Sequence, residues 1–373
     1  MSEQSLTGQQ LGPYEIGTLV GEGGCASVYR ARRTLEGPGM QAGQEVALKV
    51  FHPELVSDER TFQRFEREAD LGIRIRHPYI VPTYEIGSAP GADQTLHYIA
   101  MEFVEGETLR EVLDELGTVP EDLLYQIAEQ VLGALSVIHA EGMVHRDVKP
   151  ENIILTPGEQ QVRVMDMGVA RLQQEGRDLT LDGEFIGSLS YASPEQFTDQ
   201  DHVDIRTDIY ALGVLLYEMV TGVNPYDDSE LLGVIEKKLR QQVARPRILN
   251  RDLDPFLDEV ILTCLEKDPD DRFPTCEALR EVLTLRTEGP WWQAREGDEA
   301  LPAATRALRR LRPPRAAPLV GRTEELAALH TAYEAVKAGE GTVVLMPGPS
   351  GIGKSRLVHD FLEDLVAPDG PVL

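Results

Sequence analysis

The hydrophobic periodicity of this chain changes once along its length, and that change limits its fold more than any other feature. Between Tyr14 and Val104, short runs rich in β-branched residues alternate with glycines, interrupted by one helical stretch at 60–75. This pattern predicts a small antiparallel sheet that carries one helix. From Glu121 onward, apolar residues recur at spacings of three and four, the period of an amphipathic helix. We therefore predict an α+β fold with two lobes, the first mainly sheet and the second mainly helical.

Changes of composition and periodicity along the chain predict its domain organisation. Proline, arginine and alanine become frequent after the second lobe, which is typical of a linker. A short apolar strand at 342–346 and a helix at 355–365 then form the two ends of a βα unit. The predicted segments are a tail at 1–13, a first lobe at 14–104 with an exposed hairpin loop at 35–44, a second lobe at 105–285, a linker at 286–317 and an incomplete second domain at 318–373. Further helices are predicted at 208–221, 230–240, 255–265 and 275–285.

Charge and composition restrict the classes of partner. The formal net charge is −27, which argues against nucleic-acid binding and against binding to an anionic membrane, because both need a basic surface. No run of eighteen or more apolar residues and no secretory signal is found, so we expect a cytoplasmic protein. Cys25, Cys264 and Cys276 are far apart in sequence, which predicts reduced thiols rather than a disulfide framework or a zinc site.

A glycine-rich segment lies between two predicted strands and contains Gly21, Gly23, Gly24, Ala26 and Val28. Residues without bulky side chains let backbone amides approach phosphate oxygens, which is one interpretation of this segment. The other is a plain turn. A dinucleotide-binding loop would need the glycines to open a helix, whereas the residues that follow have the alternation of a strand.

The next predicted strand places a single lysine, Lys49, towards the interior. A buried lysine is costly unless it is paired. Glu68 is the predicted partner, because it shares one face of the following helix with Phe62 and Phe65, and that face must look toward the sheet. The alternative is a lysine that reaches solvent beside an exposed glutamate.

Two further motifs complete the series. The sequence HRDVKPEN occupies 145–152 after the predicted long helix, and DMG follows at 166–168, two short strands later. With these motifs in order, the chain resembles the protein kinase family, of the bacterial Hanks type, over 14–285. The resemblance implies the bilobal kinase fold and transfer of the ATP γ-phosphate to serine or threonine hydroxyls of protein substrates, with ATP and Mg²⁺ as cofactors.

The resemblance also implies a role for each matching residue. Asp147 would orient or accept the proton of the substrate hydroxyl, and Lys149 would steady the transferred phosphoryl group. Asn152 and Asp166 would bind Mg²⁺, which prefers oxygen ligands. Lys49 would hold the α- and β-phosphates. The implied catalytic set is Asp147, Lys149, Lys49 and Glu68. The implied nucleotide contacts are Gly21, Gly23, Gly24, Ala26, Val28, Ala47, Lys49, Met101, Glu102, Val104, Asn152 and Asp166.

Three positions depart from the family pattern. Ala26 replaces its third glycine, Met167 stands where phenylalanine is usual, and Ser188 stands where threonine is common. Methionine is apolar and adaptable, and serine keeps the hydroxyl, so no change removes a catalytic group. A catalytically weak ATP-binding scaffold is the alternative function.

Two structural contacts are also expected from the resemblance. Glu195 closes the sequence ASPE at 192–195 and matches the glutamate that pairs with Arg272. Asp208 heads a predicted helix and would hold the backbone of the loop that carries Asp147. Both contacts are expected to be structural.

Regulation by phosphorylation is a hypothesis on the same basis. Arg146 precedes Asp147, and in related kinases such an arginine pairs with a phosphate on the activation segment. Thr180 is the preferred phosphosite, with Ser188 and Ser190 as further candidates. Autophosphorylation in trans through a transient dimer would follow.

Glu151 raises a question of substrate choice, since it lies between Lys149 and Asn152 in the sequence. A carboxylate beside the catalytic loop favours a basic residue in the protein substrate. The acidic net charge agrees with that hypothesis.

The last segment carries a second nucleotide motif, GPSGIGKS at 348–355, between a predicted strand and a predicted helix. It fits the Walker A pattern and resembles ATPase domains of the AAA and signal-transduction type. The residues concerned are Gly348, Gly353, Lys354 and Ser355. No Walker B acid or arginine finger follows, so we expect an incomplete hydrolytic site, either in a truncated copy or in part of a longer kinase–ATPase fusion. An NTP-sensing regulatory protein is thus a third hypothesis.

Overall fold

A computed structural model of the chain describes the residues that carry the fold. These are residues 6–23, 26–37, 39–52, 72–91, 94–158, 161–166, 187, 189–198, 203–299, 322–337, 344, 357 and 361. The chain divides into two compact units, Met1–Thr287 and Glu288–Leu373.

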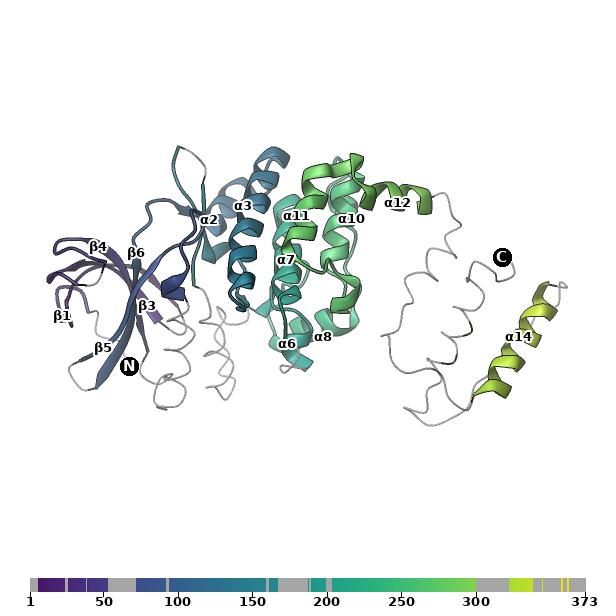
Figure 1. Cartoon of the computed structure of the whole chain (residues 1–373), viewed down its shortest axis with the longest axis horizontal. Coiled ribbons are helices and arrows are strands. Elements are labelled where there is room, and N and C mark those ends of the chain that lie inside the picture. Colours follow the sequence, from purple (N-terminus) through teal and green to yellow (C-terminus); the bar gives the residue numbers. More distant parts are fainter. Residues whose placement is uncertain are drawn as a thin grey trace. The chain divides into compact units, whose positions relative to one another are not determined.

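The first lobe is built on one antiparallel sheet, whose strands follow the order β1-β2-β3-β4-β6-β5 (Figure 1). The strands are β1 (Gln10–Leu11), β2 (Tyr14–Glu22), β3 (Ala26–Arg33), β4 (Glu45–Phe51), β5 (Thr83–Pro90) and β6 (Thr95–Glu102). Every neighbouring pair is antiparallel. The predicted small antiparallel sheet is therefore confirmed.

Each face of this sheet buries a different apolar cluster, because successive side chains of a strand point to opposite faces. Along β4, Leu48 and Val50 belong to the larger cluster. Ala47 and Phe51 belong to a smaller cluster on the other face. Lys49 lies between them in sequence and so emerges on the face of the smaller cluster. That alternation directs the lysine toward the candidate site.

Two details of this lobe differ from the sequence predictions. The segment predicted as a tail contributes β1, in which Gln10 pairs with Glu15 and Leu11 with Tyr14. The hairpin loop predicted as exposed buries Met40, which is 4% exposed and packs in the larger cluster. Both differences arise because a short segment makes a tertiary contact that its own sequence pattern does not predict.

The second lobe is mainly helical, as predicted (Figure 1). Its helices are α2 (Leu109–Leu116), α3 (Glu121–Ala140), α6 (Glu195–Thr198), α7 (Arg206–Thr221), α8 (Leu231–Arg240), α9 (Pro246–Leu249), α10 (Pro255–Cys264) and α11 (Cys276–Leu285), with 3₁₀ turns η2 (Pro150–Asn152), η4 (Pro269–Asp271) and η5 (Arg286–Glu288). The predicted helices α7, α8, α10 and α11 are confirmed to within two residues at each end.

Local signals set where these helices begin and end. Thr108 and Glu111 form a capping box at the start of α2, each side chain accepting from the backbone N–H of the other. The Asp254 side chain accepts from Phe256 N at the start of α10. Gly222 ends α7 with a φ of 76°, a left-handed conformation that favours glycine.

The helix α3 is the long apolar element of this lobe. Among the described helices, it has the length and composition of a membrane span. Ten of its residues are buried inside the lobe, where it packs against α7 and α11. Its apolar character is thus explained by its place in the core.

A second sheet, with the order β7-β8-β9, lies where the two lobes join. Its strands are β7 (Glu107–Thr108), β8 (Ile153–Leu155) and β9 (Val162–Val164). Val164 also pairs with Ile80, and Val81 N donates to Val164 O at 2.9 Å. The sheet therefore fixes β8 and β9, and the loops on either side of them, against the first lobe.

In the second unit the structure describes α12 (Pro290–Glu299) and α14 (Thr323–Lys337). The first of these helices lies in the segment predicted as a linker, and the second was not predicted. Apart from Val344, Leu357 and Phe361, the predicted strand and helix of the βα unit lie outside the described residues.

Candidate active site

The glycine-rich segment forms the turn between β2 and β3. Gly21 pairs with Val28 in the antiparallel register, and Gly23 N donates to Ala26 O at 3.0 Å. The structure therefore has the strand–turn–strand form that a phosphate-covering hairpin needs, and not the strand–helix form of a dinucleotide loop. Gly24 lies outside the described residues.

Gly21 is not required by the packing of the described protein. A Cβ built on it meets no atom within 4 Å, and its φ is not positive. At Gly17, on the same strand, a Cβ would lie 2.5 Å from Arg30 O. Gly17 is thus explained by a backbone contact within the fold, whereas Gly21 leaves open space beside the hairpin, as a ligand site requires.

We expect the substitution Gly21→Ala to separate ligand binding from stability. The free energy of unfolding should change by less than about 0.5 kcal/mol, while the KM for ATP should rise roughly tenfold, because a methyl group occupies the space left beside the hairpin. Chemical denaturation and initial rates measure the two effects. Gly17→Ala is the matched control, and it should cost about 1–3 kcal/mol of stability. An unchanged KM in Gly21→Ala would remove Gly21 from the nucleotide site.

An apolar cluster lies on the sheet face next to this hairpin. Its buried members are Ala26, Phe51, Val81, Ile99 and Met101, and Ala47, Ile86, Val104 and Met165 pack against them. Four of the predicted nucleotide contacts, Ala26, Ala47, Met101 and Val104, are thus in one place. Apolar side chains of this kind suit the ring of a purine.

At the end of β6, only some backbone groups remain to form hydrogen bonds with the edge of a purine. Glu102 N already donates to Pro82 O at 3.0 Å, and the Glu102 carboxylate pairs with Arg163. Hydrogen bonds to the ligand would therefore come from the Glu102 carbonyl or from the backbone of Val104.

Lys49 forms an ion pair with Asp166, with 2.7 Å between Nζ and Oδ2 and both side chains 11% exposed. This contact joins the first lobe to the loop after β9, where Asp166 has a φ of 64°. A non-glycine residue in that region of conformational space is strained and often lies in a functional site. Glu68, the predicted partner of Lys49, lies outside the described residues.

Asp147, Lys149 and Asn152 meet in the loop between α3 and β8. Lys149 Nζ lies 2.9 Å from Asp147 Oδ2. Asn152 Nδ2 donates to the same oxygen at 2.8 Å and to Asp147 O at 2.8 Å. The structure therefore brings together three of the predicted residues and fixes the orientation of the Asp147 carboxylate.

The charges of this group are set by their mutual contacts. Burial by itself raises the pKa of Asp147, but the Lys149 ammonium, with smaller contributions from His145 and Asn152, lowers it by more, so the pKa lies below its ordinary value. Burial lowers the pKa of Lys149, but the Asp147 carboxylate raises it above its ordinary value. Asp147 is therefore an anion and Lys149 a cation at neutral pH.

Asp208 is fully buried at the start of α7 and binds the backbone of the catalytic loop, the loop between α3 and β8 that contains Asp147. Its Oδ2 accepts from His145 N at 2.8 Å, and its Oδ1 accepts from Arg146 N at 2.7 Å. The His139 ring also contacts Oδ2 at 2.8 Å. Arg146 has a φ of 66°, so these bonds stabilise a strained backbone just before Asp147. The expected role of Asp208 is confirmed.

The residues predicted to bind Mg²⁺ fit that ion chemically. Since the side-chain NH₂ group of Asn152 donates to Asp147, the side-chain oxygen Oδ1 is the atom that remains to bind a metal. Met165 N donates to the backbone oxygen of Asn152 at 3.0 Å, which places Asp166 near Asn152. In the described part of the chain, no group of three or more His, Cys, Asp or Glu residues could hold a metal. Mg²⁺ bound through one or two protein oxygens, phosphates and water needs no such group.

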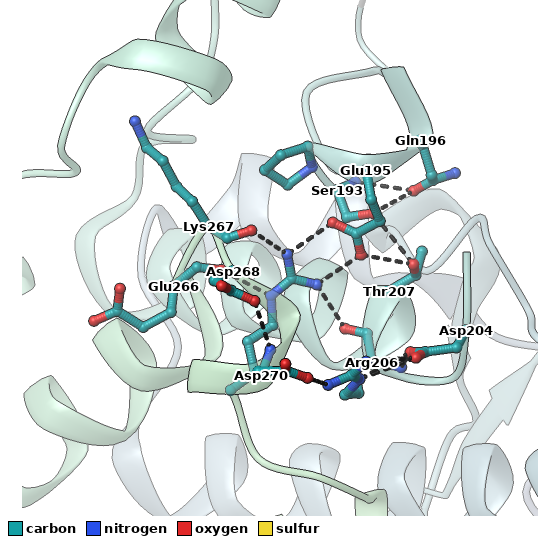
Figure 2. A network of polar contacts seen from close by, with 12 residues as sticks. Ser193, Glu195, Gln196, Asp204, Arg206, Thr207, Glu266, Lys267, Asp268 and Asp270 are labelled. Atoms are coloured by element: carbon teal, nitrogen blue, oxygen red, sulfur yellow. Dashed lines mark hydrogen bonds and ion pairs between the residues drawn. The ribbon is translucent and has the colours of Figure 1, made fainter. Parts of the chain in front are cut away.

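A network of polar contacts surrounds Glu195 in the second lobe (Figure 2). Arg272 forms two parallel hydrogen bonds with Glu195, at 2.7 and 2.8 Å, and Thr207 Oγ1 donates to Glu195 at 2.8 Å. Arg272 also donates to the backbone oxygens of Arg206, Glu266 and Lys267. The expected Glu195–Arg272 pair is therefore confirmed.

The candidate phosphosites are only partly described. Ser190 is 4% exposed, and its hydroxyl donates to Gly187 O at 2.7 Å and accepts from Asn224 at 2.9 Å. These contacts favour a structural role for Ser190. Thr180 and Ser188 lie outside the described residues, as do the Walker A residues Gly348, Gly353, Lys354 and Ser355.

Arg110 was missed by the sequence reasoning. Its guanidinium contacts Glu151, Tyr191 and Glu218. These partners come from three distant parts of the chain, so no local pattern links them. The only local sequence signal near Arg110 is the capping box of Thr108 and Glu111, which predicts the start of α2 but not the contacts of Arg110.

Comparison with known proteins agrees with this geometry. Residues 14–283 match the protein kinase domain family, and residues 318–372 match the AAA ATPase domain. The serine/threonine-protein kinase PknB of Mycolicibacterium smegmatis is 35% identical over 302 residues, covering 81% of this chain and 47% of the relative. The serine/threonine-protein kinase pkn3 of Myxococcus xanthus is 37% identical over 278 residues, covering 72% of this chain and 49% of the relative. The chain thus spans about half the length of these curated relatives.

A solved structure gives the same result for the fold. The kinase domain of PknI from Mycobacterium tuberculosis aligns with a TM-score of 0.59 and 27% identity, covering 76% of this chain and 98% of that one. The family match spans most of the chain and includes every residue of the catalytic loop. The chain therefore belongs to the protein kinase family.

Proposed function

We propose that this protein transfers the γ-phosphate of ATP to serine and threonine hydroxyls of protein substrates. The arrangement of Asp147 carries this proposal. Its carboxylate is ionised, and Lys149 and Asn152 fix its orientation. A hydroxyl placed beside Asp147 would give up its proton to that carboxylate as the phosphoryl group arrives.

The remaining groups supply charge and position rather than covalent chemistry. Lys149 lies where it can offset negative charge on a transferred phosphoryl group, and Lys49 can do so for the other phosphates. Asn152 and Asp166 would hold Mg²⁺, which supplies further positive charge to the phosphates when bound. Asp208 holds the backbone just before Asp147, which reduces the reorganisation that this loop needs during the reaction.

The direct test is to incubate the chain with γ-labelled ATP and casein, with Mg²⁺ or with EDTA. We expect label on casein or on the chain itself, found on serine and threonine after acid hydrolysis, and lost with EDTA. Label on tyrosine alone would contradict the proposed acceptor class. ATP binding without any transfer would support the scaffold alternative instead.

We further propose that the chain phosphorylates itself on the activation segment, in trans through a transient dimer, as part of a signalling pathway. The support is the family resemblance, with Arg146 next to Asp147 in a conformation held by Asp208. A phosphate paired with an arginine would add charge-assisted hydrogen bonds that order the segment.

Thr180→Ala is therefore expected to lower activity toward casein by about tenfold, the value of one hydrogen bond to a charged group. Mass spectrometry of the active protein should find phosphate on Thr180, and mixing active chain with an inactive variant should label the latter. Ser190→Ala is the comparison, since its buried hydroxyl predicts loss of stability without loss of a phosphate. Full activity of Thr180→Ala together with an unphosphorylated segment would contradict this regulation.

A further inference from the structure

Arg110, near the start of α2, connects three parts of the second lobe. Its Nε donates to Glu151 Oε1 at 3.1 Å. Its Nη2 donates to Tyr191 OH at 2.7 Å and to Glu218 Oε1 at 2.9 Å. Asp114, one turn along α2, is 3.4 Å from Nη1. One guanidinium thus binds the catalytic loop, the segment before Glu195, and α7.

One carboxylate that Arg110 binds, Glu151, lies beside the catalytic residues. Glu151 stands in η2 between Lys149 and Asn152, both of which contact Asp147. Its charge is close enough to help raise the pKa of Lys149. The Glu151 side chain is 46% exposed and that of Arg110 is 28% exposed, so a protein substrate at Asp147 could reach both.

The second carboxylate is more enclosed. The Glu218 side chain is 8% exposed, and Tyr191 OH also donates to it. Without Arg110, this carboxylate and Glu151 would form an acidic site that attracts a cation. A lysine or arginine of a substrate has the charge for such a site, and arginine has the matching fork of donors.

We propose that Arg110 is a specificity-determining residue that fills this acidic site with the protein's own guanidinium. The protein then accepts substrates that carry no basic residue near the serine or threonine, and a substrate arginine gains nothing from Glu151. This inference rests on the proposed function. It also reverses the expectation that Glu151 by itself favours a basic substrate.

The physical argument is one of competition. A substrate arginine would have to displace Arg110 from its hydrogen bonds to Glu151, Tyr191 and Glu218, or approach it against like-charge repulsion. An internal side chain needs no loss of translational freedom to bind, whereas a substrate does. The internal cation therefore holds the site unless it is removed.

The test measures substrate choice in Arg110→Met. The substrates are a neutral serine peptide and a series in which a single arginine is scanned over the positions on either side of the serine. For wild type we expect no arginine position to lower KM by more than about twofold. For Arg110→Met we expect the KM of at least one arginine peptide to be about tenfold lower than that of the neutral peptide. This is the value of one charge-assisted contact.

Three variants make the result specific. Adding Glu151→Gln to Arg110→Met should abolish the gain, since the freed carboxylate is then removed. Arg280→Met is the matched control, because it removes an arginine from the exposed ion pair with Glu129 in the same lobe, and its peptide preference should equal that of wild type. Arg110→Met with Glu218→Gln removes the buried unpaired charge and keeps the test available if the single variant does not fold.

The outcomes separate this inference from the proposed function. If wild type labels neither peptides, casein nor itself, the proposed function fails and the inference fails with it. If wild type is active but already prefers arginine peptides, the inference alone is wrong. Equal loss of activity on all peptides in Arg110→Met and in Arg110→Met with Glu218→Gln would mean that Arg110 has a purely structural role. That result would also overturn the inference.

Discussion

Replacing Asp147 with asparagine is expected to lower the rate of phosphoryl transfer by about 10²–10⁴-fold, the usual contribution of a positioned general base. Asparagine keeps the size of the side chain but cannot take a proton. It also leaves Lys149 without the carboxylate that lies 2.9 Å from its Nζ. Single-turnover transfer from labelled ATP measures this effect directly.

The same variant should bind ATP as wild type does, because Asp147 is not among the predicted nucleotide contacts. Stabilisation against thermal unfolding by added ATP checks this point. Glu129→Gln is the control, since Glu129 forms an exposed ion pair with Arg280 away from the catalytic loop. A transfer rate in Asp147→Asn within tenfold of wild type would mean that Asp147 is not the base.

Arg272→Met should cause the largest loss of stability of any single change considered for this lobe. The Arg272 side chain is fully buried, and removing it leaves the Glu195 carboxylate without its bidentate partner. Breaking a buried ion pair in this way costs about 3–5 kcal/mol, because a charge remains buried without compensation. Urea denaturation followed by circular dichroism measures the free energy of unfolding.

Two further variants separate the charge from the packing. Glu195→Gln in the Arg272→Met background should recover part of the stability, since no unpaired charge remains. Arg280→Met should cost less than about 1 kcal/mol, because its pair with Glu129 is exposed to solvent. Equal losses in Arg272→Met and Arg280→Met would show that burial of the Glu195–Arg272 pair has no special effect.

The same pair gives a pH dependence of known sign. Burial by itself raises the pKa of Glu195, but the Arg272 hydrogen bonds lower it more, so the pKa in the folded protein lies below the ordinary 4.5. The stabilisation is therefore complete above the pKa of the unfolded chain and is lost as the pH falls through the lower, folded value. The Glu195→Gln variant should show less loss of stability with acid.

Much of the fold could be predicted because the hydrophobic period of a segment agrees with the positions that the structure buries along most of the described chain. The alternation in β4 predicted that Lys49 turns inward, and the structure places it on the face of the smaller apolar cluster. The spacing in α3 predicted a buried helix, and its buried residues lie in the core. Where a pattern repeats over several residues, the sequence carries enough signal to predict the element.

Other features could not be predicted because they depend on contacts between distant segments. The two residues of β1 are too few to show a period and exist only through pairing with β2. The helix α12 lies in a segment whose proline and arginine content is typical of a linker, and Pro290 stands at its first position, where proline is tolerated. Arg110 depends on three partners far apart in sequence.

The ion pair between Lys49 and Asp166 makes nucleotide binding an exchange of partners. Before binding, the two opposite charges neutralise each other at 2.7 Å. A nucleotide that uses the Lys49 ammonium for its phosphates, and the Asp166 carboxylate for their counter-ion, must first separate the pair. The affinity for ATP is then the difference between two sets of ionic contacts. Asp166→Asn would remove the partner of Lys49 in the free protein and the carboxylate proposed to hold the counter-ion in the bound one. The effects of substitutions at Lys49 and Asp166 on ATP affinity are therefore expected to be non-additive.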